Sequence, residues 1–180
     1  MSIWADERRQ GTDELLLTLP GSDFDVVVGK YLGAVAIFSV SLIISLIANH
    51  YVLSQLGNPD FGLLVSTYLG YWFVGLSMIA IGMVASFLTA NLTVAFVLGV
   101  AFNAPLALVP DSELAIATNF LDFSRGIIST SGMIFFLGLA LSMLYLSSIL
   151  IGRRHWFGSP LGKSKYSHFS LRVLATLVTA

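Results

Sequence analysis

The chain has 180 residues, of which 56% are apolar and only 11% are charged, and its formal net charge is −1. Soluble globular domains carry about a quarter charged residues, so this composition lacks the polar surface that a soluble fold needs. The near-neutral charge gives no basis for nucleic-acid binding, and the absence of cysteine excludes disulfides, thiolate metal sites and thiol nucleophiles. The composition therefore indicates an integral membrane protein.

Residues 1–29 form a polar segment that precedes the first apolar run. Thr12 can cap a short helix, because two acidic residues then fall in its first turn, where the helix dipole favours anions, and Pro20 ends that helix. Residues 22–25 have the pattern of a capping box that opens a longer helix. The segment is therefore predicted to hold a short cytoplasmic helix, which is either an interfacial anchor without a partner or a docking element for a soluble protein.

Four intervals without Asp, Glu, Lys or Arg are long enough to cross a membrane. About 20 apolar residues, rising roughly 1.5 Å each, span the ~30 Å hydrocarbon core. The third interval is the shortest and contains Asn103 and Pro105, so a kinked helix is expected there. Residues 30–152 are therefore predicted to form an all-α, polytopic transmembrane helical bundle with spans near 31–53, 62–88, 92–109 and 131–152.

The stretch between the last two spans, residues 110–130, mixes apolar and polar side chains. Its middle, 114–128, contains Asp122 and Arg125 among apolar residues, a pattern typical of a helix that lies on the membrane surface. The sequence therefore predicts an interfacial outer helix, and a disordered loop is the alternative.

Basic residues are distributed unevenly between the two sides that four spans define. With the N-terminus inside, eight of the nine lie on the cytoplasmic side and only Arg125 lies outside. Cytoplasmic loops carry this excess, so a cytoplasmic N-terminus is predicted. Residues 153–180 then form a cytoplasmic tail, whose apolar end at 171–180 begins a possible further span. A helix that stopped inside the bilayer would leave carbonyl groups unsatisfied, so we expect that span to continue in a longer product.

The predicted spans lack the groups that intramembrane chemistry requires. No charged side chain lies in them, whereas proton relays and ion-coupled transport depend on such groups. Ser77 and Ser86 have no serine-nucleophile motif around them and are expected to bond to carbonyl groups of their own helix. Residues 158–164 fail the spacing of a phosphate-binding loop. No cofactor, metal site or catalytic residue is predicted, which argues against an intramembrane enzyme.

Three groups of residues resemble the motifs of one membrane-protein family. They are Glu7-Arg8-Arg9-x-Gly11-Thr12-x-Glu14-Leu15-Leu16 with Pro20, Gly29 and Lys30; Ser86-x-Leu88-Thr89-x-Asn91; and Phe123-Ser124-Arg125-Gly126 followed by Arg153-Arg154-x-Trp156. In this order, over residues 5–157, the sequence resembles the type-2 ABC transporter permeases, and the gliding-motility-type permease is the closest subgroup.

The resemblance implies a permease subunit that is driven by a separate ATP-binding-cassette ATPase and catalyses nothing itself. It implies a place in the plasma (inner) membrane, a second permease copy or a related permease as partner, and a possible auxiliary protein behind the tail. Members of the family usually have two further spans before the segment that matches Glu7. The alternative function is a non-transport membrane anchor or assembly protein whose helices only pack.

The resemblance also implies two sets of functional residues. The segment 7–20 would couple closure of the ATPase to movement of the spans, with the ATPase bound through residues 12–19. The expected coupling residues are Glu7, Gly11, Thr12, Glu14, Leu15, Leu16, Pro20, Gly29 and Lys30, and the outer-loop motif contributes Asp122, Arg125 and Gly126.

Overall fold

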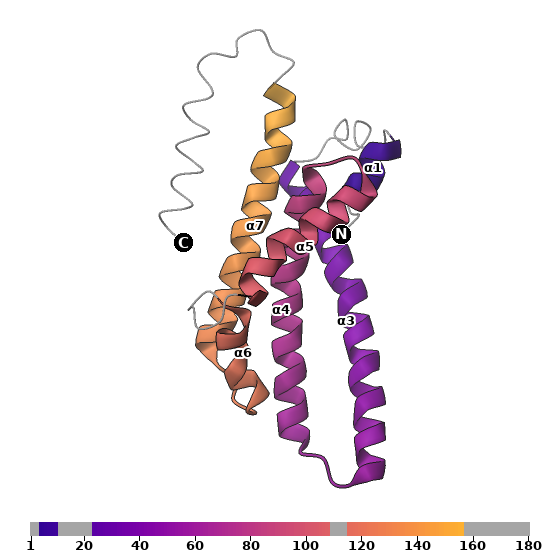
Figure 1. Ribbon diagram of the computed structural model, residues 1–180, viewed down its shortest axis with the longest axis vertical. Coiled ribbons are helices and arrows are strands. Elements are labelled where there is room, and N and C mark those ends of the chain that lie inside the picture. The colour runs from indigo at the N-terminus through magenta and orange to yellow at the C-terminus, as the bar shows by residue number, and fades with distance from the viewer. Residues whose placement is uncertain (1–3, 11–22, 109–114, 157–180) are drawn as a thin grey trace.

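The computed structural model describes residues 4–10, 23–108 and 115–156 (Figure 1). Within these ranges every regular element is a helix and no residue lies in a strand. The helices are α1 (Ala5–Gln10), α3 (Asp23–Leu56), α4 (Phe61–Phe87), α5 (Leu92–Leu108), α6 (Ile116–Ser124) and α7 (Thr130–Trp156). The prediction of an all-α helical membrane bundle is confirmed.

Among the described residues, three helices, α3, α4 and α7, are long and apolar enough to cross a membrane. They coincide with the spans predicted near 31–53, 62–88 and 131–152. Helix α3 extends beyond its uncharged interval because it already begins at Asp23, in the predicted capping box. Asp60 starts α4, since its side chain accepts hydrogen bonds from the backbone of Gly62 and Leu63 at 2.9 and 3.3 Å.

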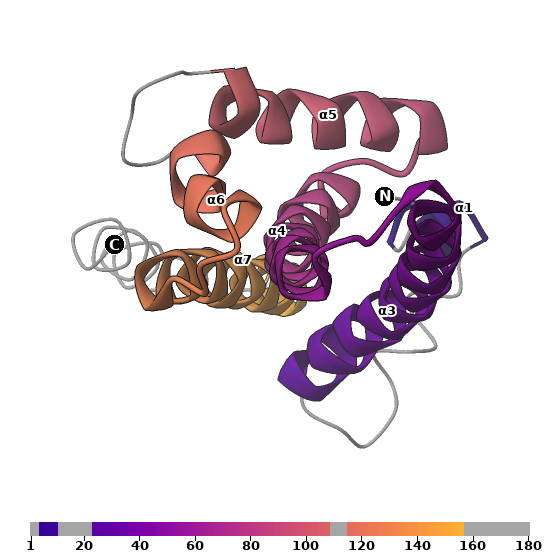
Figure 2. The same cartoon turned by 90° about the horizontal axis from the view of Figure 1, so that it is seen from below.

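Helix α5 lies in the interval where the sequence predicts a span near 92–109. Its described part has 17 residues, which is about 25 Å of helix and is shorter than α3, α4 and α7, so its role as a span stays a prediction. Figures 1 and 2 show that α5 runs obliquely across α4 instead of alongside it. The apolar length of a segment does not determine this tilt, which depends on packing against α4. Helix α7 ends at the same end of the bundle at which α3 begins (Figure 1). The described helices therefore bring the chain back to that end.

Helix α4 is the centre of the bundle and has contacts with α3, α5, α6 and α7 (Figure 2). Its residues 80–87 are all buried. Helix α5 buries Ala95, Gly99 and Asn103, which are spaced four residues apart and so share one face. Small side chains at this spacing let two helices approach closely, and α5 therefore rests on α4 in spite of its tilt.

Side-chain hydrogen bonds from one helix to the other hold α3 against α4. The Tyr31 hydroxyl donates to the Leu76 carbonyl oxygen at 3.1 Å, and Trp72 Nε1 donates to Ser39 Oγ at 2.9 Å. In lipid, helices have no hydrophobic driving force to associate, so hydrogen bonds between them matter. Each such bond contributes about 0.6 kcal/mol on average to the stability of the helix bundle. They fix how far α3 can slide along α4.

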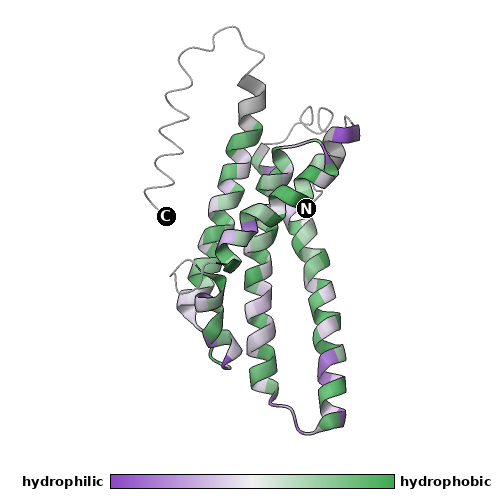
Figure 3. Cartoon of the chain, in the orientation of Figure 1, coloured by the Kyte–Doolittle hydropathy of each residue, from purple (hydrophilic) through white to green (hydrophobic). Residues whose placement is uncertain are grey.

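The long helices are mostly apolar along their length, and polar residues gather at α1 and at the turn between α3 and α4 (Figure 3). In the most apolar stretch of α3 only 11% of residues are buried, against 61% in α4. Ile37, Ile44 and Ile47 are among the large side chains that α3 exposes. An apolar surface of this extent fits lipid chains, which supports the predicted place in a bilayer.

Candidate coupling surface and outer-loop motif

The structure covers only part of the predicted coupling segment. Glu7 lies in α1, although its side chain is outside the described residues, and Gly29 and Lys30 lie near the start of α3. The other predicted coupling residues, and the short helix expected over 12–19, lie outside the described residues: Gly11, Thr12, Glu14, Leu15, Leu16 and Pro20. The described part of the coupling segment therefore consists of its two ends, which flank residues 11–22.

The segment meets the bundle at Trp4, directly before α1. The Trp4 side chain is only 1% exposed and belongs to the hydrophobic core. Its ring meets that of Phe87 in α4 edge-on, with centroids 5.2 Å apart. Lys30 Nζ lies 4.3 Å from the ring centroid, and a cation in this position is attracted by the quadrupole of the indole. Trp4 therefore contacts both α3 and α4, and one predicted coupling residue, Lys30, is part of this contact.

Ser86 makes the second contact with this segment, and here the sequence-based prediction was wrong. Its buried Oγ accepts hydrogen bonds from the backbone N–H groups of Trp4 and Ala5, both at 3.0 Å, whereas a bond to its own helix was expected. Ser77 does follow the expectation, donating to the Val74 carbonyl oxygen at 2.8 Å. The partners of Ser86 lie 82 and 81 residues away in the chain, so its place in the S-x-L-T-x-N motif was the only available signal.

Gly29 lies apart from this contact. It is exposed, and a Cβ added to it or to Gly33 would meet no atom within 4 Å. The described residues therefore do not join Gly29 to Trp4 or Ser86, and its coupling role stays a prediction.

The outer-loop motif lies at the C-terminal end of α6. Gly126 has a φ of +84°, which residues with a side chain rarely adopt. The Ile127 N–H donates to the Asp122 carbonyl oxygen at 3.0 Å, and the Gly126 N–H donates to the Phe123 carbonyl oxygen at 3.2 Å. This pair of bonds is the Schellman motif that ends a helix. The backbones of Asp122 and Gly126 thus turn the chain from α6 toward α7, while the Arg125 side chain is exposed.

Phe123 holds α6 against the bundle, a role that the sequence did not reveal. Its side chain is fully buried, and its carbonyl oxygen also accepts a hydrogen bond from Ser66 Oγ of α4 at 3.1 Å. A Cβ on Gly70 of α4 would lie 2.7 Å from Phe123 Cβ, and a Cβ on Gly132 of α7 would lie 2.8 Å from Phe123 Cε2. The two glycines therefore make the space that Phe123 fills. The helix predicted within 114–128 is present at 116–124, and its place on the membrane surface stays a prediction.

We expect Gly126→Ala to lower the free energy of unfolding by about 1–2 kcal/mol, because a Cβ is strained at a φ of +84°. Unfolding in mixed detergent micelles measures this change. The matched control is Gly57→Ala, in the exposed α3–α4 turn, where a Cβ would meet no atom within 4 Å. If both variants unfold like the original protein, the helix-ending role of Gly126 is contradicted.

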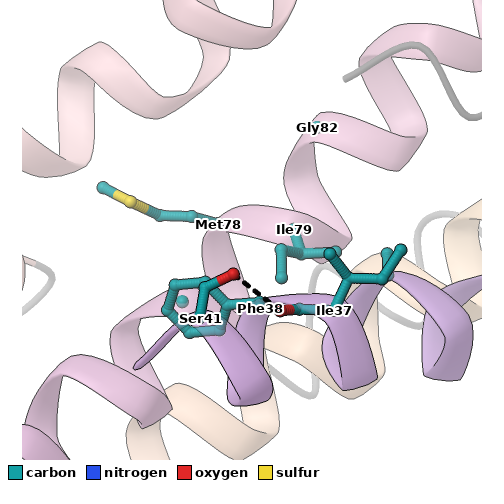
Figure 4. Close-up of a pocket in the computed structure, with 8 residues that line it drawn as sticks. Ile37, Phe38, Ser41, Met78, Ile79 and Gly82 are labelled. Atoms are coloured by element: carbon teal, nitrogen blue, oxygen red, sulfur yellow. Dashed lines mark hydrogen bonds between the residues drawn. The ribbon is translucent and has the colours of Figure 1, made fainter. Parts of the chain in front are cut away.

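An apolar groove of about 520 Å³ lies between α3 and α4 (Figure 4). Ile37 and Phe38 of α3 line it opposite Met78 and Ile79 of α4. Ser41 supplies the hydroxyl group of the lining, and this hydroxyl already donates to the Ile37 carbonyl oxygen of its own helix at 2.9 Å. The groove therefore offers shape and apolar contact but no uncommitted side-chain donor that could select a polar substrate.

The described residues form a bundle of apolar helices with a polar segment attached at one end, and they contain no cluster of three or more acidic or histidine side chains that could hold a metal ion. This arrangement defines a polytopic helical membrane protein. A family model described as ABC-2 family transporter protein matches residues 1–154, and the chain belongs to this family. No curated protein and no solved structure matches the chain.

Membership of the ABC-2 family confirms the type-2 permease class that the motifs indicated. The chain is the membrane permease component of an ABC transporter, a transport subunit that is not itself catalytic. The gliding-motility subgroup, the identity of the ATPase and the membrane in which the protein lies stay predictions.

Proposed function

We propose that the chain is a gliding-motility-type permease subunit that moves its substrate across the plasma (inner) membrane with ATP hydrolysed by a separate ATP-binding-cassette subunit. The family match over residues 1–154 is the observation that carries this function. The interiors of the helices support an external source of energy, since residues 31–56, 61–87 and 130–152 contain no Asp, Glu, Lys or Arg, and intramembrane charges are the usual sign of ion-coupled transport. A second permease copy or a related permease completes the pathway.

In this proposal residues 1–29 receive the movement of the ATPase. Both ends of the stretch 11–22 join the bundle, one through the contact of Trp4 with α4 and the other through the start of α3. A force applied to residues 12–19 would therefore act on α3 directly and on α4 through Trp4. The outer-loop residues Asp122, Arg125 and Gly126 lie at the end of α6 and do not contribute to this contact.

Purification of the tagged chain from its native membranes tests the function. We expect an ATPase with a P-loop to co-purify in stoichiometric amount and to hydrolyse ATP in a vanadate-sensitive manner. A tagged membrane protein of another family, purified in parallel, controls for carry-over. A chain that purifies without any ATPase would support the anchor or assembly function instead.

The proposed orientation predicts the labelling of single cysteines in this otherwise cysteine-free chain. Gly57→Cys lies in the exposed turn between α3 and α4, and Arg9→Cys lies in α1 at an exposed position. With the N-terminus in the cytoplasm, a membrane-impermeant maleimide should label intact cells at Gly57→Cys and should reach Arg9→Cys only after lysis. The reverse pattern would contradict the orientation.

A further inference from the structure

We propose that Trp4 and Ser86 form a latch that carries movement of the N-terminal segment into α4, and that Ser86 is a positioning residue of the transport cycle. The inference rests on the proposed function, because an ATPase must supply the movement. It names the point at which that movement enters the helix bundle.

The hydrogen bonds of the latch converge on one oxygen atom. The N–H groups of two consecutive residues, Trp4 and Ala5, both donate to Ser86 Oγ at 3.0 Å, and all three residues are buried. A buried N–H group without an acceptor destabilises the structure by its full desolvation cost. Among the described residues, Ser86 Oγ is the side-chain acceptor of both N–H groups, so their position depends on a hydroxyl group at residue 86.

The Trp4 ring holds the N-terminal segment in place between α3 and α4. Its edge-on contact with Phe87 joins it to α4, and Lys30 Nζ, 4.3 Å from the ring centroid, joins it to α3. Aromatic pairs of this geometry and cation–π contacts each contribute in addition to the area that they bury. The hydrogen bonds and the ring contacts act on adjacent residues of α4, Ser86 and Phe87, so the segment and the end of α4 are held as one unit.

Ser86 lies in the buried end of α4, so a movement of this residue would be passed on to the neighbouring helices. Residues 80–87 are buried without interruption, and α4 has contacts with α3, α5, α6 and α7. Because packed helices shift as rigid units, displacement of this end of α4 is passed to every helix that contacts it. Helix α1 itself also touches α5.

Amide hydrogen exchange tests whether the latch exists, independently of any ATPase. Ser86→Ala removes the shared acceptor with little change in volume, and the exchange of the Trp4 and Ala5 amides should rise by roughly tenfold or more, as expected for two lost hydrogen bonds. Ser77→Ala is the matched control, since Ser77 is an equally buried serine of α4 that bonds to its own helix. It should leave these amides unchanged.

ATP-dependent movement tests whether the latch transmits force, which a merely structural contact would not do. Gly57→Cys, at the far end of α3, reports movement through its rate of maleimide labelling with and without ATP and vanadate. In the complex with its ATPase, we expect Ser86→Ala to keep the ATPase bound but to lose the change in labelling rate. Ser77→Ala should retain both.

Each outcome decides one part of the inference. Unchanged exchange at Trp4 and Ala5 in Ser86→Ala overturns the latch. Increased exchange with a normal labelling response shows a structural contact only, and loss of the bound ATPase shows that Ser86 supports docking instead of transmission, so both overturn the positioning role. If the unsubstituted protein binds no ATPase, the proposed function fails together with this role, whereas the exchange result still decides whether the contact exists.

Discussion

Phe123→Ala is expected to lower the free energy of unfolding by about 3–5 kcal/mol, the usual cost of removing a buried aromatic ring. The ring is fully buried and lies where Gly70 and Gly132 leave space between α4 and α7. Without it, α6 keeps the Ser66 hydrogen bond to its backbone but loses its main packing contact. Chemical unfolding in mixed micelles measures the loss, and faster amide exchange in α6 would show that this helix is the part released.

Leu121→Ala is the matched control for this prediction. Leu121 lies in the same helix, two residues earlier, but its side chain is exposed, so its removal should change the free energy of unfolding by less than about 0.5 kcal/mol. Equal effects of the two substitutions would show that Phe123 does not anchor α6.

Gly132→Ala is expected to destabilise the protein by about 1–3 kcal/mol, the range for overpacking a filled site. The added Cβ would lie 2.7 Å from the Asn119 carbonyl oxygen and 2.8 Å from Phe123 Cε2. The ring could move aside, but the carbonyl belongs to the backbone of α6, so the whole helix must shift away from α7. Unfolding in mixed micelles measures the loss, and increased exchange in α6 locates it.

Gly138→Ala provides the comparison within the same helix. A Cβ at Gly138 would meet no atom within 4 Å, and alanine favours helix over glycine, so this variant should be as stable as the original protein or slightly more stable. A loss of stability equal to that of Gly132→Ala would assign the effect to helix α7 in general and would contradict close packing at Gly132.

The sequence predicted the long helices well because a membrane span has a strict physical requirement. A run without charged residues that covers ~30 Å of hydrocarbon has few alternatives to a helix, and α4 differs from its predicted interval of 62–88 by one residue at each end. Helix α5 has the same apolar pattern, but its oblique course across α4 (Figure 1) was not predicted. Its tilt depends on the face formed by Ala95, Gly99 and Asn103 against α4, which is a property of the assembled bundle.

The candidate site shows where local reasoning from the sequence ends. The sequence indicated Gly126 only through the family resemblance, and the turn with which this glycine ends α6 was not predicted. The role of Phe123 depends on glycines in two other helices. Ser77 and Ser86 show the same limit within one helix. A rule about nearby carbonyl groups described Ser77 correctly, but the donors to Ser86 lie 82 and 81 residues earlier in the chain, and no local pattern contains that information.

The proposed ATP-driven function is tested most directly by the amount of ATPase that co-purifies with Leu16→Asp. A carboxylate in an apolar docking segment should weaken the association by roughly thirtyfold, as loss of a central interface contact does. Leu56→Asp, the same substitution at an exposed site in the last turn of α3, is the matched control and should retain the ATPase. Loss with Leu16→Asp alone is the predicted result, and equal retention by both variants would contradict coupling through residues 12–19.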